Sequence, residues 1–535
     1  MTRTASHNDL SPTGGEHDVV VVGGGHNGLV AAAYLAKAGL DVLVVERQAK
    51  CGGGVVTEEL TLPGFWHDAF SSDHALIQAN PLISQDELGL KSKYGLNFLT
   101  HSPGTAFVFP DERALILHDE IEKTCESISQ FSRRDAEAYP KFIQSCREME
   151  SILALYMFSP PPSFGSMISF LESSERGREY LRLILSSALE VAEDWFESEE
   201  VRAALVRSVS EVLIPPQQQG TGNFVFKFAP AAGGVVITEG GSGALTNALT
   251  RYLDDSGASI LTSSPVEAIK VESGEARGVV LRTGEEILAK RAIVSSLNAR
   301  QLFLELLPRS AVPSSFLGSL ARVRPSVFVT MKQDIALSEA PRFKAGGDVD
   351  QALFVRVTLP LEEMLRMYDD FRHGIPQTKD LGIGTPTLAD PSRAPEGKHV
   401  LFIWQHEPYS VKGGATRWDE LKTEIADGAL KTLQEHTQNL GPETILGRFV
   451  RTPLDLERYN PTWAGGDGNH FGVSLSQLFS NRPLPGWGQY RTPIKRLFLA
   501  GASTHPGPGV SGGGRAAALR VMEDLGINVR KALER

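Results

Sequence analysis

The stretch GGGHNGLVAAAYLAKAGLDVLVVER, residues 23–47, directly follows four consecutive valines at 19–22. The valine run predicts a buried strand, and the apolar residues 29–36 predict a helix that ends at Gly39. A second strand is expected at 42–45. A strand, a G-x-G-x-x-G turn, a helix and a second strand in this order predict a parallel α/β sheet that binds a dinucleotide.

Each glycine of this turn has a mechanical reason. Gly23 permits the tight turn, Gly25 lets the backbone approach a pyrophosphate, and Gly28 lets the helix pack close to the strand. The helix N-terminus favours phosphate, because it carries about half a positive charge. Glu46 stands at the distance, about 20 residues, where an acid binds the ribose hydroxyls and repels a 2′-phosphate. The alternative is a glycine-rich turn in an ordinary βαβ unit.

The composition excludes several classes of protein. The chain has 535 residues and a net charge of −11, which argues against nucleic acid as a partner. Its three cysteines form no CxxC pair, so neither a disulfide framework nor a zinc site is expected, and no other metal-ligand cluster stands out. There is no G-x-S-x-G hydrolase elbow. The polar N-terminus and the absence of a long apolar run favour a cytoplasmic protein.

A second glycine group after the acidic residue distinguishes FAD from NAD. Gly52 and Gly53 follow the second predicted strand closely, and an NAD dehydrogenase has no need of them. Here the chain resembles the two-dinucleotide-binding flavoproteins, in which such a pair runs along the FAD pyrophosphate and ribityl chain. Many members carry Arg where this sequence has Gly54. The resemblance implies FAD as the cofactor.

Within these flavoproteins the chain is most similar to the phytoene desaturase-like FAD-dependent oxidoreductases, in the branch of the pyridine nucleotide-disulfide oxidoreductase domain-containing 2 type. Besides the first turn, the resemblance rests on GGGVVTEELTLPGF at 52–65, on residues 238–298, and on RPLPGWGQYRTPIKRLFLAGASTHPGPGVSGGGRAAA at 482–518. These stretches follow the family's order along most of the chain. The resemblance identifies the family but not a substrate.

The glycine-rich stretch 501–514 follows a predicted strand at 497–500 and precedes a helix that is expected to begin near Gly513. In the resembled family this loop and helix start hold the N1–C2=O2 edge of the isoalloxazine, and a valine at the place of Val266 holds the adenine through its backbone. The two glycine stretches are therefore expected to bind opposite ends of one FAD. The expected cofactor-binding residues are Gly23, Gly25, His26, Asn27, Gly28, Glu46, Arg47, Gly52, Gly53, Gly54, Val55, Val266, Gly501, Gly509 and Val510.

The resemblance implies an α/β fold, with a Rossmann-like FAD-binding domain, a mixed-sheet substrate domain and a helical lid insertion. The expected divisions are a flexible arm at 1–16, FAD-binding parts at 17–75, 231–300 and 456–535, the lid insertion at 76–230 and the substrate domain at 301–455. Residues 121–210 should be mostly helical, with a break at 159–163.

The lid has two interpretations. In the family it shapes a substrate tunnel and in some members touches a membrane, and the apolar residues 152–158 could do so here, in a cytoplasmic protein associated with a membrane. The alternative is a helix face buried in the core, as is usual for such a stripe. Strands expected at 327–331, 352–357 and 400–405 should form the sheet over the flavin.

Candidate substrate contacts and bases come from these segments. The aromatic wall is expected from Phe328, Phe354, Phe402, Trp404 and His406, and the segment before the last strand adds His470 and Gln477. His505 and His74 are candidate catalytic bases, with a structural hydrogen-bonding role as the alternative for His505.

The sequence predicts an oxidoreductase that moves two electrons from an apolar or partly apolar small molecule to FAD, and from there to oxygen or a quinone. The alternatives are a redox-neutral isomerase or hydratase and a non-catalytic flavin-binding scaffold. No second full G-x-G-x-x-G stands between a strand and a helix, so a separate NAD(P) site is not expected.

Overall fold

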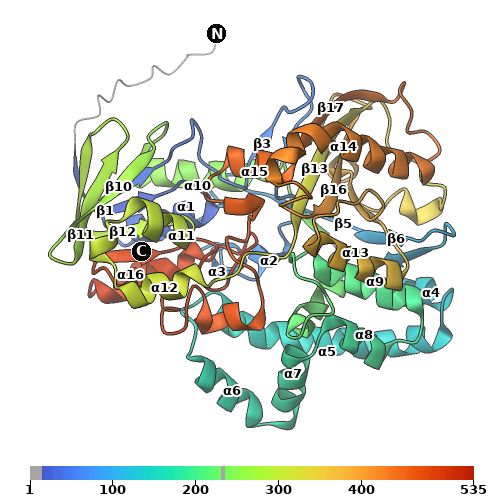
Figure 1. Cartoon of the computed structure of the whole chain (residues 1–535), viewed down its shortest axis with the longest axis horizontal. Helices are drawn as coiled ribbons and strands as arrows, with labels where there is room; N and C mark the ends of the chain where they lie inside the picture. Colours follow the sequence, from blue (N-terminus) through green and yellow to red (C-terminus); the bar gives the residue numbers. More distant parts are fainter. Residues whose placement is uncertain (1–14, 230–234, 535) are drawn as a thin grey trace.

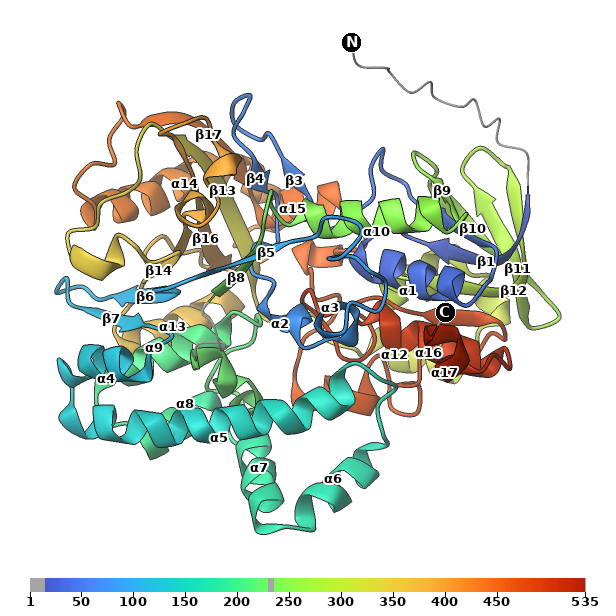
Figure 2. The ribbon, with the colours of Figure 1, turned by 180° about the vertical axis from the view of Figure 1, so that it is seen from behind.

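The computed structural model describes residues 15–229 and 235–534. Two sheets stand side by side, and the helices of residues 121–210 form a layer below one of them (Figure 1). The view from behind shows the same arrangement, with α6 and α7 projecting from the helical layer (Figure 2). The α/β class with mixed sheets is confirmed.

The first sheet contains the dinucleotide-binding unit. Strands β1 (Glu16–Val22) and β2 (Val42–Val45) pair in parallel on either side of the turn into α1 (His26–Lys37). The strand order is β10-β11-β12-β1-β2-β9, and β18 pairs with β12. The further strands are β9 (Ser259–Leu261), β10 (Val266–Glu272), β11 (Glu275–Leu281), β12 (Glu286–Ser295) and β18 (Leu497–Leu499).

One detail of this sheet differs from expectation. Residues 286–295 form one long strand, β12, whose first half pairs with β11 and whose second half pairs with β18. The expected arm at 1–16 lies outside the described residues up to position 14. Glu16, however, already belongs to β1 and is in register with Leu288, because β12 extends far enough to pair with it.

Glycines set how closely the helices cover this sheet. A Cβ on Gly28 would lie 2.1 Å from the carbonyl oxygen of Gly23, and one on Gly514 would lie 2.0 Å from that of Asn27. Only glycine lets α1 lie so near its own turn and lets α16 (Gly514–Asp524) lie against α1. On the same face, α10 (Gly243–Asp255) buries Leu245, Leu249 and Leu253, which recur at every fourth residue and so lie on one side of the helix.

The second sheet has the order β17-β13-β16-β15-β14-β6-β7. The three strands predicted here correspond to β13, β14 and β16, and the structure adds four more. Two of them, β6 and β7, come from the segment 76–230, which therefore supplies strands as well as helices. The strands are β6 (Thr105–Val108), β7 (Ala114–Leu117), β13 (Val329–Leu337), β14 (Phe354–Val357), β15 (Leu381–Gly384), β16 (His399–Glu407) and β17 (Ile445–Arg451).

The helical layer follows the predicted pattern, including the break at 159–163. In five of its helices an N-cap serine accepts a hydrogen bond from the first turn, which explains the regular Ser spacing between them. The layer consists of α4 (Ile121–Ser129), α5 (Arg133–Met157), α6 (Phe164–Glu172), α7 (Glu175–Leu185), α8 (Ala188–Trp195) and α9 (Glu199–Ser210).

The apolar end of α5 packs within this layer. Ile152 and Leu153 lie against the core that α5 shares with its neighbours, and Phe158 is buried. The side chains of residues 154 and 155 lie outside the described part of the chain; among those described in the layer, the exposed large apolar ones are Phe170 and Leu185. None of the helices in the described ranges combines the length and the apolar character needed to cross a membrane.

Candidate cofactor and substrate site

One cavity of about 830 Å³ lies between the two sheets. Segments far apart in the sequence meet on its wall, as the two-ended hypothesis requires. The expected cofactor-binding residues that line it are Gly23, Gly25, His26, Asn27, Glu46, Arg47, Gly53, Gly54, Val55, Val266, Gly501, Gly509 and Val510.

The glycine turn leaves open space where a phosphate would approach. A Cβ on Gly25 would find no protein atom nearer than the Cα of Gly53, at 4.0 Å. Gly25 is also the N-cap of α1 and provides no side-chain acceptor, so the first N–H groups of the helix face the cavity without a cap. Gly28 does not line the cavity and acts through helix packing instead.

The second glycine group is hydrogen-bonded to the first glycine turn. The Gly52 N–H donates to the Gly24 carbonyl oxygen at 2.8 Å, and Gly52 itself lies outside the cavity wall. Gly53 has φ +59°, a conformation that favours glycine. A Cβ on Gly54 would lie 2.9 Å from the Trp463 ring. Any side chain at position 54 would therefore crowd this ring.

Glu46 is held in place at the end of β2. Its Oε2 accepts from the Gly24 N–H at 2.7 Å, and its Oε1 accepts from the Gln48 N–H at 2.7 Å. The next residue, Arg47, donates to the Tyr459 carbonyl oxygen at 3.2 Å. Two backbone donors thus orient the carboxylate at the cavity edge, where an acid can meet ribose hydroxyls.

The far glycine stretch joins this wall through His26 and Asn27. The Asn27 side chain accepts from the Gly514 N–H at 3.2 Å, so it links the starts of α1 and α16. His26 lines the cavity, and its buried Nε2 has no hydrogen-bond partner among the described residues. Burial lowers the pKa of His26 to about 4. An open glycine cradle, an uncapped helix start and an unpaired ring nitrogen fit a dinucleotide.

The structure places both candidate bases away from the cavity wall. His74 is fully buried, and its Nδ1 hydrogen-bonds the Thr238 hydroxyl at 2.6 Å. The Nε2–H of His505 donates to the Tyr156 carbonyl oxygen at 2.8 Å, in the last turn of α5. Burial lowers the pKa of each to about 4. Both histidines therefore lie off the cavity wall and each hydrogen-bonds a neighbouring segment, and a role for either as a base stays a prediction.

The expected substrate contacts divide into two groups. Phe354, Phe402, Trp404 and His470 line the cavity. His406 has the same strand parity as Trp404, but it is fully buried with its ring 4.7 Å from those of Phe328 and Trp404. His406 and Phe328 are not on the cavity wall, because the end of β16 and the residue before β13, which pairs with it, lie beyond the cavity in the core.

Gln477 is the other expected contact that lies off the wall. Its side chain donates to the carbonyl oxygens of Arg324 and Gly472, both at 2.9 Å, and accepts from the Arg324 N–H at 2.7 Å. The amide is fully used in fixing these two loops. His470, which remains on the wall, hydrogen-bonds the Ser503 hydroxyl at 3.0 Å, and burial lowers its pKa to about 3.

Charged side chains that the sequence did not single out also line the cavity, at the end away from the glycine turn. They are Asp73, Glu211, Lys227, Lys332 and Arg356. For Arg356 the signal was available, since it lies two residues after Phe354 in β14 and so shares its face of the sheet. The others come from separate elements, and no local pattern predicts that they meet.

Lys332 connects this end of the cavity to a buried polar network. Its ammonium donates to the Asp68 carbonyl oxygen at 2.8 Å and pairs with Asp334, and it lies 4.9 Å from the centre of the Phe402 ring. Burial lowers its pKa, against the opposing effect of Asp334.

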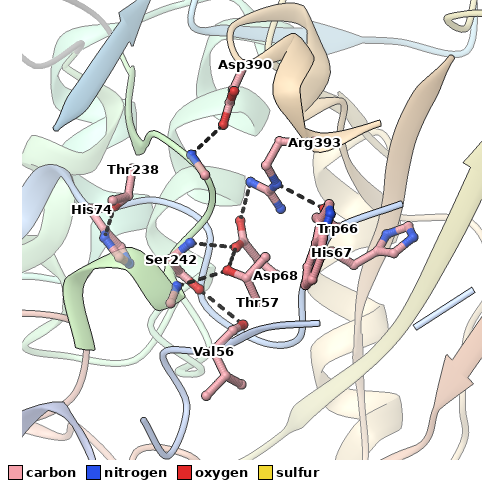
Figure 3. Close-up of polar contacts among 12 residues, drawn as sticks. Val56, Thr57, Trp66, His67, Asp68, His74, Thr238, Ser242, Asp390 and Arg393 are labelled. Carbon is pink, nitrogen blue, oxygen red and sulfur yellow. Dashed lines mark hydrogen bonds and ion pairs between the residues drawn. The ribbon is translucent and has the colours of Figure 1, made fainter. Parts of the chain in front are cut away.

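The network around Asp68, here called the Asp68 junction, consists of Asp68, Arg393, Thr57 and Ser242 (Figure 3). The Asp68 carboxylate accepts from the Arg393 guanidinium at 3.1 Å, from the Thr57 hydroxyl at 2.9 Å and from the Ser242 N–H at 2.7 Å. Burial acts to raise the pKa of Asp68, but Arg393 and these hydrogen bonds outweigh it and lower the pKa. The junction links the start of α10 to the segment that contains Arg393, which connects strands β15 and β16 of the second sheet.

Comparisons with known proteins agree with this site. The family model described as flavin containing amine oxidoreductase matches residues 28–314. The pyridine nucleotide-disulfide oxidoreductase domain-containing protein 2 of Rattus norvegicus is 32% identical, over 95% of this chain and 94% of its own length. One of the subunits of a limonene dehydrogenase from Castellaniella defragrans is 28% identical, over 96% of this chain and 95% of its own length.

A solved structure shows the same fold. The oxidoreductase from Methanosarcina mazei has a TM-score of 0.59 at 18% identity, and the match covers 95% of this chain and 99% of that one. The glycine cradle, the uncapped helix start and the family match agree on one cofactor. The chain therefore belongs to the flavin-containing amine oxidoreductase family and is an oxidoreductase that uses FAD.

Proposed function

We propose that this protein oxidises an organic substrate with an apolar body, which binds against the aromatic wall at one end of the cavity. The observation that carries the proposal is the continuity of the cavity. One space runs from the glycine turn and Glu46 to Phe354, Phe402 and Trp404. FAD bound there would accept two electrons and a proton, as a hydride, from the substrate.

The chain's own residues supply position and environment. The aromatic side chains of β14 and β16 form an apolar surface that excludes water from the substrate. Gly509 and Val510 line the same cavity together with Gly501, so the far glycine loop presents backbone to it. Because the cavity-lining His26 and His470 have lowered pKa values, both are neutral near pH 7. Preorganised, uncharged donors of this kind favour charge that develops during a reaction.

The electrons then pass to oxygen or to a quinone. This part of the proposal rests on the chemistry of reduced flavin and on the name of one relative, a component of a limonene dehydrogenase. An oxidase and a dehydrogenase differ in how fast the reduced protein reacts with oxygen.

The test is a visible spectrum of the purified holoprotein, photoreduced without oxygen and then mixed either with air or with a soluble ubiquinone analogue. Rapid reoxidation by air identifies an oxidase, and rapid reoxidation by the quinone alone identifies a dehydrogenase. Failure to bind flavin after reconstitution contradicts the whole proposal. Reduced flavin that neither acceptor reoxidises contradicts the electron-transfer part and favours a redox-neutral reaction.

A further inference from the structure

Besides Lys332, the substrate end of the cavity carries four charged side chains from four separate elements, here called the cavity cluster. Asp73 precedes the short helix α2 (Ala75–Gln78), Glu211 is the C-cap of α9, Lys227 lies in the 3-10 helix Thr221–Phe228, and Arg356 lies in β14. All four line the cavity, together with the aromatic wall. An apolar tunnel for a hydrocarbon does not need such a cluster.

Within the cavity cluster one ion pair is complete. The Arg356 guanidinium pairs with the Glu211 carboxylate, which also lies 3.9 Å from Arg207. Arg356 also lies 5.7 Å from the centre of the Phe354 ring, so this cation stands directly beside the aromatic wall. Its buried Nε has no hydrogen-bond partner within the described ranges.

The other two charges are left open toward the cavity. Across residues 15–229 and 235–534, Lys227 makes no ion pair and no hydrogen bond through its ammonium. The Asp73 carboxylate accepts from the Ala75 N–H at 2.9 Å, and it too lacks a cation at ion-pair distance within the same ranges. Its side chain is accessible, and it faces the cavity.

Elsewhere near the cavity the chain pairs its buried charges. Arg207 and Asp380 are both fully buried behind Trp404, with the guanidinium Nε 2.5 Å from the carboxylate. Lys332 pairs with Asp334. Pairing offsets the cost, roughly several kcal/mol, that burial imposes on a lone charge, whereas Lys227 and Asp73 keep some access to water and face the cavity without an ion-pair partner in the described ranges. The open charges of the cavity cluster therefore point to a ligand as their partner.

The sign of the ligand follows from the balance of charge. The ion pairs Arg356–Glu211, Lys332–Asp334 and Arg207–Asp380 are each neutral. The net charge that this end of the cavity offers to a ligand therefore depends on Asp73 and Lys227. Burial raises the pKa of Asp73, with Glu211 adding to this and Lys227 opposing it. The Asp73 carboxylate already accepts from the Ala75 N–H, whereas the Lys227 ammonium on the same wall has neither an ion-pair nor a hydrogen-bond partner within the described ranges. That arrangement favours an anion over an ammonium group.

We propose that the substrate is an amphiphile, whose anionic group of the carboxylate class binds Lys227 while its apolar body lies against Phe354, Phe402 and Trp404. This inference rests on the proposed function, since it names the class of substrate for the same cavity. It excludes a pure hydrocarbon, which would cover the half-buried Lys227 without giving it a partner.

The experiment titrates the FAD-loaded protein with octanoate, octanol and octylamine and follows the flavin absorbance. Octanoate is expected to bind tightest. Lys227→Gln should weaken octanoate binding by at least about tenfold and leave octanol binding unchanged, because only the anion loses its partner. Lys227→Arg, which keeps the charge, should retain most of the affinity. Lys431→Gln, which removes a charge from the exposed side of α14 (Trp418–Glu435), is the matched control and should have no effect.

Two results overturn this inference. One is octylamine binding more tightly than octanoate and losing affinity in Asp73→Asn. The other is equal octanoate affinity in Lys227→Gln and wild type, when both hold equal FAD and have equal melting temperatures. Because the titration measures binding without turnover, either failure is distinct from a failure of the proposed function, which appears as absent flavin or as flavin that no acceptor reoxidises.

Discussion

Asp68 and Asp73 lie in one short segment, separated by residues 69–72, yet the fold uses them in opposite ways. Asp68 is buried in the Asp68 junction, where Arg393, Thr57 and Ser242 all donate to its carboxylate. Asp73 opens onto the cavity and accepts from the Ala75 N–H. Their pKa values move in opposite directions, lowered for Asp68 and raised for Asp73.

The contrast between Asp68 and Asp73 distinguishes charged groups that stabilise the fold from charged groups that are available to bind a ligand. A buried carboxylate whose acceptors are filled by the protein stabilises its ionised form, and removing a partner leaves an uncompensated charge. A carboxylate on a cavity wall has little to lose in stability and can respond to what binds. Substitutions in the two clusters should therefore affect different measurements.

The largest effect is expected when the Asp68 junction loses its cation. Arg393→Met leaves the Asp68 carboxylate buried without its ion-pair partner, and should lower the free energy of unfolding by about 3–5 kcal/mol. Urea denaturation measures this. Arg530→Met, which breaks the exposed Arg530–Glu534 pair, is the control and should cost less than about 1 kcal/mol. A loss below about 1 kcal/mol for Arg393→Met would show that the junction is not structural.

The same contrast between packed and open positions applies to two glycines of one turn. Gly28→Ala places a Cβ 2.1 Å from the Gly23 carbonyl oxygen and should lower the free energy of unfolding by about 3 kcal/mol or more. FAD binding should be lost as well, because the turn can no longer form. Gly25→Ala meets no protein atom closer than 4.0 Å, so the apoprotein should keep its stability while FAD binds at least about tenfold more weakly. Calorimetric titration with FAD and melting of the apoprotein separate the two. Equal loss of stability in both variants contradicts the assignment of Gly25 to the cavity.

A third prediction concerns His505, which lies off the cavity wall and donates to the Tyr156 carbonyl oxygen. Burial lowers its pKa to about 4, whereas an unfolded histidine ionises near about 6.5. Protons therefore bind the unfolded chain preferentially between these values, so the stability from neutral His505 is complete above about pH 6.5 and is lost as the pH falls toward 4. At about pH 5 this loss amounts to about 2 kcal/mol.

His505→Gln retains a donor for the Tyr156 carbonyl oxygen but cannot be protonated. Its stability should fall less than that of the wild type between about pH 7 and about pH 5, as measured by urea denaturation at each pH. Substrate-dependent flavin reduction should be unchanged. Loss of that reduction, with FAD content and stability preserved, would restore His505 as a catalytic base.

The smallest change in stability is expected in the cavity cluster. Asp73→Asn keeps an oxygen to accept from the Ala75 N–H and removes no ion pair, so it should cost less than about 1 kcal/mol. Asp68→Asn, the matched change in the junction, should lower the free energy of unfolding by at least about 2 kcal/mol. It weakens the buried pair with Arg393, and the new amide N–H would face groups that themselves donate to Asp68 in the wild type. If the two variants melt alike, the distinction between the clusters fails.

The sequence predicted the parts of this molecule that are encoded locally. The strand, glycine turn and helix at 16–37, the leucine face of α10 and the break between α5 and α6 were all readable, because each depends on a period or on a conformation that neighbouring residues impose. Short strands such as β6 and β15 were missed, since four residues carry too little periodicity. His406 was misplaced because strand parity gives a side chain's face but not how far the cavity extends along the strand.

What the sequence determined by itself was the dinucleotide-binding unit, the choice of FAD and the alternation of apolar residues that builds the second sheet. What only the tertiary structure decided was which distant residues meet. Trp463 beside Gly54, Arg393 on Asp68, and Lys227 near Asp73 join segments with no common pattern. The physical reason is that backbone geometry and hydrophobic period act over a few residues, whereas the partner of a buried charge is selected by the packing of the whole chain.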